Sequence, residues 1–483
     1  MMAELFALSV AFVIGWGYLR IVLGAVGTTL LTAMAFPVGI AIWGVVAALS
    51  VMMPFRYSVT AITLVCLAGV AVANWKKGPR SSLLEGYYFA WGLMILVSLG
   101  AFFVYFDFTG VTTDSMFVLS AGKQIIEQGE LTQTMKGVLA SFAIYLSLLE
   151  TAAFVLGLDY FKSFLPVCLV STLAIFIIFA IRAKCPMGKT ARVENFITPF
   201  LGVIVLITTY AFLWHGFYVK ASPVYTLFLF LCCGATFFAH READPRWLYA
   251  VLPAALATTL LRMEAGLTML PMLVVVMAAG KIPLRKRLWF VISVSAVIAI
   301  WYAFLVERSF GHGLFSVYEL VALGALPTAF AATAILLSWL HIKLGSSWPD
   351  WLIQKMPLVM CGVLTLFIFT CILMLGERSL KPLEALYCYV AGANAGVSNF
   401  WSGMFILLLL IPFLTRGNDA EWIFAANAGG FILLVFSITV IAPWKHCGVH
   451  DSANRILTQI MPIVLFYFVL RFGDFRSHKL SRY

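Results

Sequence analysis

The chain has 483 residues, of which 63% are hydrophobic and 11% are charged, and its mean hydropathy is +1.00. A soluble protein of this length could not bury so much apolar surface, so the composition excludes a soluble globular protein and predicts an all-α polytopic membrane protein. The net charge of +11 comes from short basic clusters between apolar runs, as in the cytoplasmic loops of membrane proteins, and argues against nucleic acid as a partner.

Cysteine and histidine spacing gives no sign of a metal centre. The nine cysteines are scattered and show no CxxC or CxxH pattern, so we expect neither a zinc site nor a disulfide framework. His446 and His450 are four residues apart, which suits metal ligation only within a helix, and Gly448 between them argues against one. We therefore predict no metal site.

A helix needs about 20 apolar residues to span a bilayer. Apolar runs of about this length or somewhat shorter lie at 3–19, 34–53, 57–74, 86–106, 137–157, 164–181, 196–215, 222–239, 247–261, 267–280, 288–306, 318–340, 356–375, 399–415, 422–443 and 456–470. No segment outside these runs is long enough to fold alone. We expect residues 1–483 to form a single membrane domain with about 13–15 spans.

The basic connectors between the runs predict sidedness. The four most basic lie at 75–80, 182–192, 281–287 and 471–482. Because Lys and Arg concentrate in cytoplasmic loops, all four should face the cytoplasm and any two should be separated by an even number of crossings. Three apolar runs lie between the first two connectors, so one of them should not cross. We select 137–157, which contains Glu150 and directly follows a polar loop.

This count divides the membrane domain into three parts. Residues 1–85 supply extra N-terminal spans, residues 107–163 form an outer loop with juxtamembrane helices, and residues 164–483 supply the remaining spans.

Within the outer loop, residues 112–129 predict an amphipathic helix at the membrane interface. Thr112 or Thr113 can cap its N-terminus, and Asp114 then lies in the first turn. An apolar stripe at helical spacing is formed by Val118, Ala121 and Ile125. Asp114 is either a capping residue alone or a reactive carboxylate, and Asp107 just upstream is either a solvated loop acid or a second candidate.

The even number of membrane crossings between basic connectors places many polar side chains on the outer side of the membrane. They include Asp107, Asp114, His215, Lys220, Arg262, Glu264, Arg308, His312, Asn394, His450, Asp451 and Arg455. Charges at membrane depth are costly and usually serve a cavity or a substrate. Arg262 and Glu264 lie between two short apolar runs, so they form either an ion pair at a hairpin tip or part of a phosphate site. Arg455, at the start of the last span, is a candidate for binding an anionic head group.

Three segments together resemble the glycosyltransferase-C superfamily, whose members transfer a sugar from a polyprenyl-phosphate carrier at the outer membrane face. Residues 113–131 look like its acid-headed juxtamembrane helix, residues 252–271 like its small-residue run ending in Arg and Glu-Gly, and residues 451–468 like the start of its last helix. The chain departs from the family in its extra N-terminal runs and its lone acid. Its Glu-Gly pair is also interrupted by Ala265.

The resemblance implies a glycosyltransferase-C-like bundle and an inverting reaction. Asp114, or Asp107 as its rival, would be the base, and Arg262 and Arg455 would bind the leaving phosphate, supported by Lys220 and Arg308. Remaining candidates for substrate binding are Glu264, His215, His312, Asn394, His450 and Asp451. The implied partners are a polyprenyl-phosphate-linked sugar and an envelope glycan or lipid acceptor, without a cofactor. The segments look like those of bacterial members, which suggests an inner membrane with the active site facing the periplasm.

Two other functions are compatible with outer charges in a polytopic protein. A secondary transporter would place its charges near the midplane, in broken helices and often in inverted repeats, but no repeat is visible here. A lipid-linked polysaccharide polymerase or ligase usually depends on a long late outer loop, whereas the long outer element here is early, at 107–163.

Overall fold

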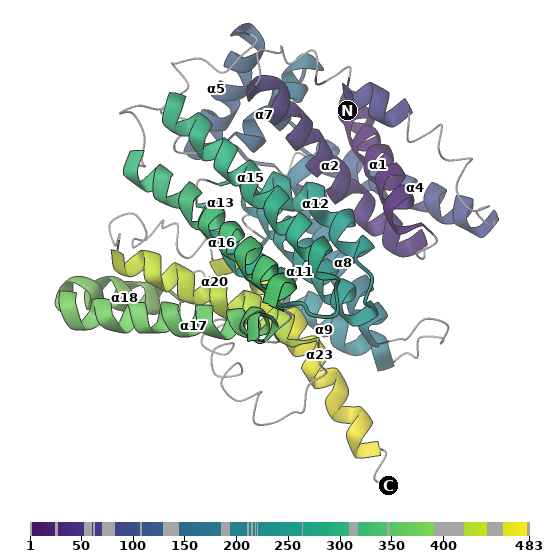
Figure 1. Cartoon of the computed structure of the whole chain (residues 1–483). Coiled ribbons are helices and arrows are strands. Elements are labelled where there is room, and N and C mark those ends of the chain that lie inside the picture. Colours follow the sequence, from purple (N-terminus) through teal and green to yellow (C-terminus); the bar gives the residue numbers. More distant parts are fainter. Residues whose placement is uncertain are drawn as a thin grey trace.

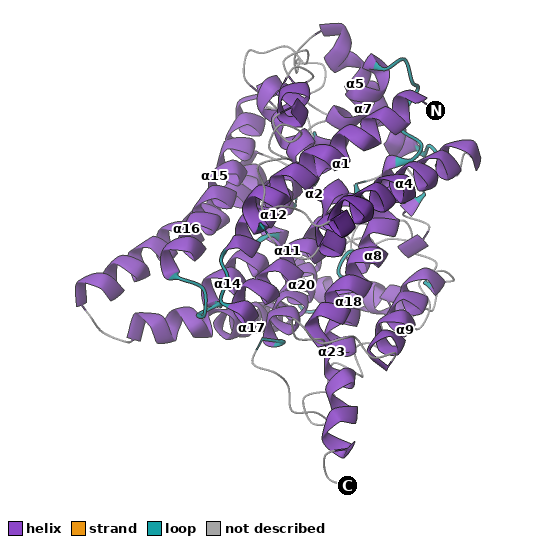
Figure 2. Ribbon diagram, turned by 90° about the vertical axis from the view of Figure 1, so that its right-hand side faces the viewer, coloured by secondary structure: helices purple, strands orange, loops and turns teal. Residues whose placement is uncertain are grey.

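The computed structural model describes residues 2–24, 28–52, 60, 63–69, 83–106, 109–128, 144–184, 194–209, 212–213, 216–217, 219, 221–262, 264–308, 317–344, 348–390, 420–441 and 457–480. Within these ranges the chain is helical apart from turns, and no strand occurs among them (Figure 2). The prediction of an all-α polytopic membrane protein is confirmed.

The helices follow one another without an intervening soluble domain in the described ranges (Figure 1). They are α1 (Met2–Leu23), α2 (Thr28–Met52), α4 (Leu83–Phe106), α5 (Thr113–Gln128), α7 (Tyr145–Val155), α8 (Phe164–Lys184), α9 (Glu194–Thr208), α11 (Ser222–Glu242), α12 (Arg246–Thr259), α13 (Ala265–Thr268), α14 (Leu270–Ala278), α15 (Leu284–Arg308), α16 (Val317–Leu344), α17 (Trp348–Leu375), α18 (Glu377–Val390), α20 (Trp422–Ile441) and α23 (Met461–Leu480).

Among the described residues, eight helices are long and apolar enough to cross a membrane: α1, α2, α8, α11, α15, α16, α17 and α20. Shorter apolar helices accompany them in α4, α7, α9, α13–α14 and α23. Every residue of the apolar window of α11 is buried, whereas none of the α17 window is. Helix α11 is therefore the central helix of the bundle, and α17 is a peripheral helix with an exposed apolar surface.

One end of the bundle is strongly basic, and we call it the basic end. Its described Lys and Arg residues include Arg182, Arg241, Arg246, Lys281, Arg285 and Lys286. The guanidinium of Arg182 binds both carboxylate oxygens of Glu242, with Nε–Oε1 and Nη2–Oε2 distances of 3.1 and 3.0 Å. Trp247 donates its indole N–H to the same carboxylate. These contacts tie the C-termini of α8 and α11 to the first turn of α12.

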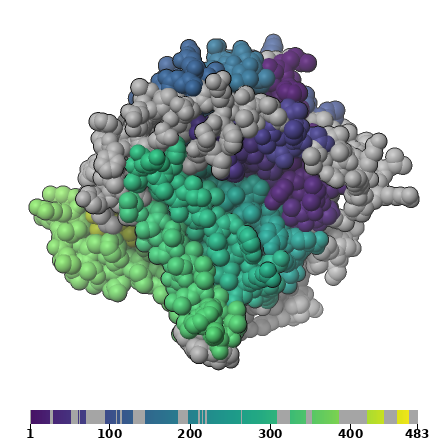
Figure 3. Space-filling model, turned by 45° about the horizontal axis from the view of Figure 1, so that its top comes forward, coloured from purple at the N-terminus to yellow at the C-terminus, as the bar shows by residue number. Residues whose placement is uncertain are grey.

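Helices α5 and α7 lie at the opposite end, away from the C-terminal end of α23, in both ribbon views (Figures 1 and 2). Seen with the top of Figure 1 brought forward, the green surface of α15 and α16 lies between the purple N-terminal helices and the light-green α17–α18 (Figure 3). We call the end of the bundle at which α5 and α7 lie the α5 end.

Small residues let α1 and α2 approach closely. A Cβ atom at Gly15 or Gly39 would collide with the backbone of Ala35 or Ala11, respectively, on the partner helix. These four residues form the small-xxx-small pattern that membrane helices use for close packing. The Gly24 turn after α1 lies beside Arg246, since a Cβ there would be 3.9 Å from its Nη1 atom. The C-terminal end of α1 is thus at the basic end.

Candidate functional site

The α12–α14 segment is a short hairpin that begins and ends at the basic end. Helix α12 has 14 residues and rises about 21 Å, and α14 has 9 residues. Neither reaches across the roughly 30 Å core of a bilayer. The described residues between α12 and α14, 260–262 and 264–269, include α13 and are buried or half-buried in the bundle, and we call this segment the hairpin tip.

Arg262 and Glu264 form an ion pair at the hairpin tip. The Arg262 Nε atom donates to Glu264 Oε1 at 2.9 Å, and Nη2 donates to the same oxygen. The side chains are only 15% and 12% exposed. The ion-pair interpretation of these residues is confirmed, and the phosphate interpretation stays a prediction. A guanidinium has five N–H donors, so three remain outside this pair.

Tyrosine hydroxyls from two long helices hold the hairpin tip. The hydroxyls of Tyr225 in α11 and Thr268 in α13 are hydrogen-bonded to each other. The hydroxyl of Tyr302 in α15 accepts the N–H of Gly266 at 3.1 Å. Both tyrosines are buried, and burying a polar group is tolerable only when it has such a partner. The tip is thereby fixed to α11 and α15.

Helix α7 provides a third attachment through Tyr145. Its N–H donates to the carbonyl oxygen of Leu260 at 3.1 Å, at the end of α12. Its hydroxyl donates to the carbonyl oxygen of Ile40 in α2 at 2.7 Å, and its ring fills the space that a side chain at position 44 would occupy. Gly44 is therefore required for α7, α2 and the hairpin tip to meet.

The start of α5 has the predicted capping geometry. Thr112 precedes the helix. Its N–H donates to Ser115 Oγ at 3.0 Å, the N–H of Ser115 donates to Thr112 Oγ1 at 3.4 Å, and the two hydroxyls are hydrogen-bonded to each other at 3.0 Å. This reciprocal arrangement resembles a capping box and identifies Thr112 as the capping residue. Asp114 lies in the first turn of α5, as predicted. The predicted apolar stripe, Val118, Ala121 and Ile125, is buried.

The apolar side of α5 packs on α7. The hydroxyl of Thr151 in α7 donates to the carbonyl oxygen of Gly122 at 3.3 Å. A Cβ at Gly122 would lie 2.9 Å from the carbonyl oxygen of Ser147, so no larger residue fits without a shift. Helix α7 has 11 residues, about 16 Å, and is shorter than a span.

The start of α5 is anchored just ahead of α11. Ser115 Oγ donates to the carbonyl oxygen of Val219 at 2.9 Å. Gly110 exchanges backbone hydrogen bonds with Phe217 and Val219, at 2.8 and 3.2 Å. Tyr225, six residues beyond Val219, holds the hairpin tip. The backbone of Asp114 and the Arg262–Glu264 pair therefore lie toward the same end of α11.

The tip lies beside the first turn of α11, near the end of that helix opposite the basic end. Tyr225 is 17 residues from Glu242 at the basic end, which corresponds to about 25 Å of helix. Arg308 closes α15 six residues after Tyr302, so its backbone also lies at the α5 end. The other predicted site residues lie outside the described part of the chain: Asp107, His215, Lys220, His312, Asn394, His450, Asp451 and Arg455.

Two buried carboxyl groups hold the loop before α8. Glu150 Oε2 in α7 accepts the N–H of Phe161 at 2.9 Å. Glu4 Oε1 in α1 accepts the N–H and hydroxyl of Ser163, at 2.5 and 2.7 Å. Burial raises the pKa of the Glu150 carboxyl to about 8, aided by the nearby Glu4 and opposed by the Phe161 hydrogen bond. At the level of the sequence, Glu150 indicated only that its helix does not cross the membrane, and its contact with Phe161 was not predicted.

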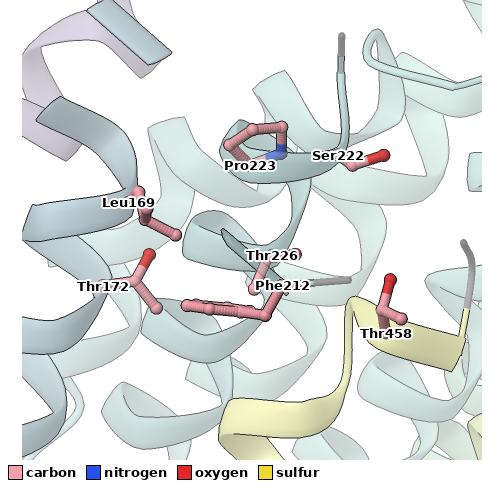
Figure 4. Close-up of a pocket in the computed structure, with 7 residues that line it drawn as sticks. All are labelled: Leu169, Thr172, Phe212, Ser222, Pro223, Thr226 and Thr458. Atoms are coloured by element: carbon pink, nitrogen blue, oxygen red, sulfur yellow. The ribbon is translucent and has the colours of Figure 1, made fainter. Parts of the chain in front are cut away.

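A small cavity lies near the N-terminus of α11, between α8 and the turn before α23 (Figure 4). Its volume of about 10 Å³ admits at most one water. Hydroxyl-bearing residues at its wall are Thr172, Ser222, Thr226 and Thr458. It is too small for a sugar, so we do not assign it as the substrate site.

A larger apolar groove of about 280 Å³ lies between α1, α2, α4 and α8. It follows helical stripes from Thr29 to Phe36 on α2 and from Val167 to Ile178 on α8. This shape suits one lipid chain lying parallel to the helices. None of its lining residues belongs to the hairpin tip, so the groove and the Arg262–Glu264 pair are separate features.

Within the described residues, no three His, Cys, Asp or Glu side chains lie close enough together to hold a metal ion. No protein-family model, curated protein or solved structure matches the chain.

Proposed function

We propose that the chain is a membrane glycosyltransferase that moves a sugar from a polyprenyl-phosphate donor to an envelope glycan or lipid acceptor at the α5 end. One observation carries the proposal. The acid-headed helix α5 is anchored at Val219, just ahead of α11, and the Arg262–Glu264 tip is held by Tyr225 in the first turn of that helix. This arrangement supports the proposal, because it brings the backbone of Asp114 and the Arg262–Glu264 pair, from distant parts of the sequence, toward one end of the bundle.

In the proposed reaction, Asp114 takes the proton of the acceptor hydroxyl as that oxygen attacks the anomeric carbon. The bond between the anomeric carbon and the phosphate oxygen breaks, and both electrons leave with the polyprenyl phosphate. This single displacement inverts the anomeric configuration. Asp107 is the alternative base.

Arg262 would stabilise the charge that develops on the departing phosphate. Its three N–H donors outside the Glu264 pair can bind phosphate oxygens, while the carboxylate holds the guanidinium plane in place. Arg455, Lys220 and Arg308 are further candidates for the same phosphate. Six further residues are proposed to contact the substrate: Glu264, His215, His312, Asn394, His450 and Asp451.

The phosphate role can be tested with the full-length protein in detergent. Undecaprenyl phosphate is the probe, because it represents the leaving group whichever sugar is transferred. We expect Arg262→Gln to weaken its binding at least tenfold, and Lys381→Gln, an exposed base on α18, to leave binding unchanged. Equal binding by the Arg262→Gln and unmodified proteins would remove Arg262 from the site.

A secondary transporter is the second candidate, because a broken hairpin with a charged tip inside the bundle is typical of transporters. A cysteine placed at the half-buried Leu267 of a cysteine-free chain separates the two functions. In oriented vesicles, a transporter should expose this cysteine to an impermeant thiol reagent from each side in turn. A transferase should expose it only from the α5 end.

A further inference from the structure

The basic end carries an exposed surface where α12 and α15 begin. We call it the α12–α15 basic surface and define it by Arg246, Tyr249, Lys281, Arg285, Lys286 and Trp289. All four of its bases are exposed. They serve no role in the proposed transfer reaction, which lies at the other end of the bundle.

The positive charge of this surface is only partly neutralised by the protein. Arg246 pairs with Asp244, with Nη2 and Oδ2 at 2.7 Å. Among the described residues, no carboxylate forms an ion pair with Lys281, Arg285 or Lys286. The surface therefore complements an anion.

An aromatic ring places one of these bases against α12. The ammonium of Lys286 lies 5.4 Å from the centroid of the Tyr249 ring, within the range of a cation–π contact. The backbone carbonyl of Tyr249 accepts the hydroxyl of Tyr18 from α1 at 2.6 Å, which holds this part of α12. The bases thus belong to a fixed surface where three helices meet.

The exposed face of α15 continues the surface into the membrane. Trp289 is 59% exposed one turn beyond Arg285, and Ile292 and Ile300 are 38% and 59% exposed farther along the same face. The order along the helix is cation, aromatic ring and aliphatic side chains. This is the order in which a membrane presents phosphate, the interfacial layer and hydrocarbon.

We propose that the α12–α15 basic surface binds an anionic phospholipid of the adjacent leaflet. Arg285 and Lys286 contact the phosphate, Trp289 lies at the level of the glycerol, and one acyl chain follows the exposed face of α15. The continuous apolar face favours a lipid over free phosphate, because free phosphate would gain nothing from Trp289, Ile292 and Ile300.

Lipid retention by the purified full-length protein, measured by native mass spectrometry, tests this proposal. The probes are dioleoyl phosphatidylglycerol and dioleoyl phosphatidylcholine, each with and without millimolar inorganic phosphate. We expect the anionic lipid to be retained at least fivefold more than the zwitterionic one. The Arg285→Gln/Lys286→Gln double variant should lose roughly tenfold or more of this retention, since each base near a membrane surface contributes about a fivefold gain.

Two control variants distinguish the contribution of charge to lipid retention from that of the apolar face. Lys381→Gln removes an exposed charge on α18, where Glu377 is its local partner, and should change nothing. Trp289→Ala should weaken retention of both lipids. Equal retention of the two lipids, or an unaffected double variant with an unchanged unfolding temperature, would overturn the proposal. Displacement of the anionic lipid by inorganic phosphate would also overturn it, because it would identify a free-anion site.

Discussion

The hydroxyl groups of Tyr225 and Thr268 are hydrogen-bonded to each other across the interior of the bundle. This contact joins the first turn of α11 to the segment that follows the Arg262–Glu264 pair. Thr268 Oγ1 also lies 3.2 Å from the carbonyl oxygen of Glu264, to which it can donate. The position of the ion pair therefore depends on a tyrosine in another helix.

We predict that Tyr225→Phe destabilises the protein by about 0.5–1.5 kcal/mol, because one buried hydrogen bond is lost while Thr268 keeps the carbonyl oxygen of Glu264 as its acceptor. Thermal unfolding in detergent measures the effect. Tyr105→Phe is the matched control, since Tyr105 is 79% exposed and should tolerate the change. If the two variants unfold at the same temperature, the Tyr225 hydroxyl does not hold the hairpin tip.

Stability should depend on pH through Glu150. The buried carboxyl has a pKa of about 8, whereas the unfolded chain has an ordinary value near 4.5. The unfolded state then releases a proton across this interval while the folded state retains it, so stability falls as pH rises from about 4.5 to 8 and stays low above it.

We predict that Glu150→Gln removes most of this pH dependence, because a neutral amide can still accept the N–H of Phe161. Above pH 8 the variant should unfold at a higher temperature than the unmodified protein. Glu127→Gln is the control, since Glu127 is exposed on α5. A steep decline in unfolding temperature from pH 5 to 8.5 that persists in the Gln variant would exclude Glu150 as its source.

Local signals predicted part of the site from the sequence. The start of α5 was predictable because Thr112 and the stripe of Val118, Ala121 and Ile125 act within one helix. The Arg262–Glu264 pair was one of two interpretations of charges between short apolar runs. Both features depend only on contacts between residues that are close in the sequence, so they can be inferred without knowing how the helices pack.

The contacts that place these elements together were not predictable in this way. Tyr225 and Thr268 are 43 residues apart, and Tyr302 and Gly266 are 36 apart. A tyrosine in an apolar run indicates that its hydroxyl needs a partner, but does not identify it. Helix packing selects the partner, and a single sequence does not record that packing.

Close approach of α1 and α2 should make Gly39 intolerant of a larger residue. A side chain there would collide with the backbone of Ala11, and neither helix can move without opening the surrounding contacts. We predict that Gly39→Leu abolishes folding or destabilises the protein by more than 3 kcal/mol, through overpacking. Gly69→Leu is the matched control, because a Cβ at Gly69 meets no atom within 4 Å. Folded protein yield and unfolding temperature distinguish the two, and similar values for both would contradict the observed helix contact.

The proposed role of Asp114 as base can be tested independently of the proposed phosphate binding by Arg262. Asp114→Asn removes the proton acceptor but keeps the size of the side chain, so sugar transfer should fall by about 10²- to 10⁴-fold. Binding of undecaprenyl phosphate should persist, because Arg262 is unchanged. Glu127→Gln, on the same helix, should retain both activities. A chain that loses transfer on Asp107→Asn but not on Asp114→Asn would assign the proton to Asp107, and loss in neither variant would reject a carboxylate base in this loop.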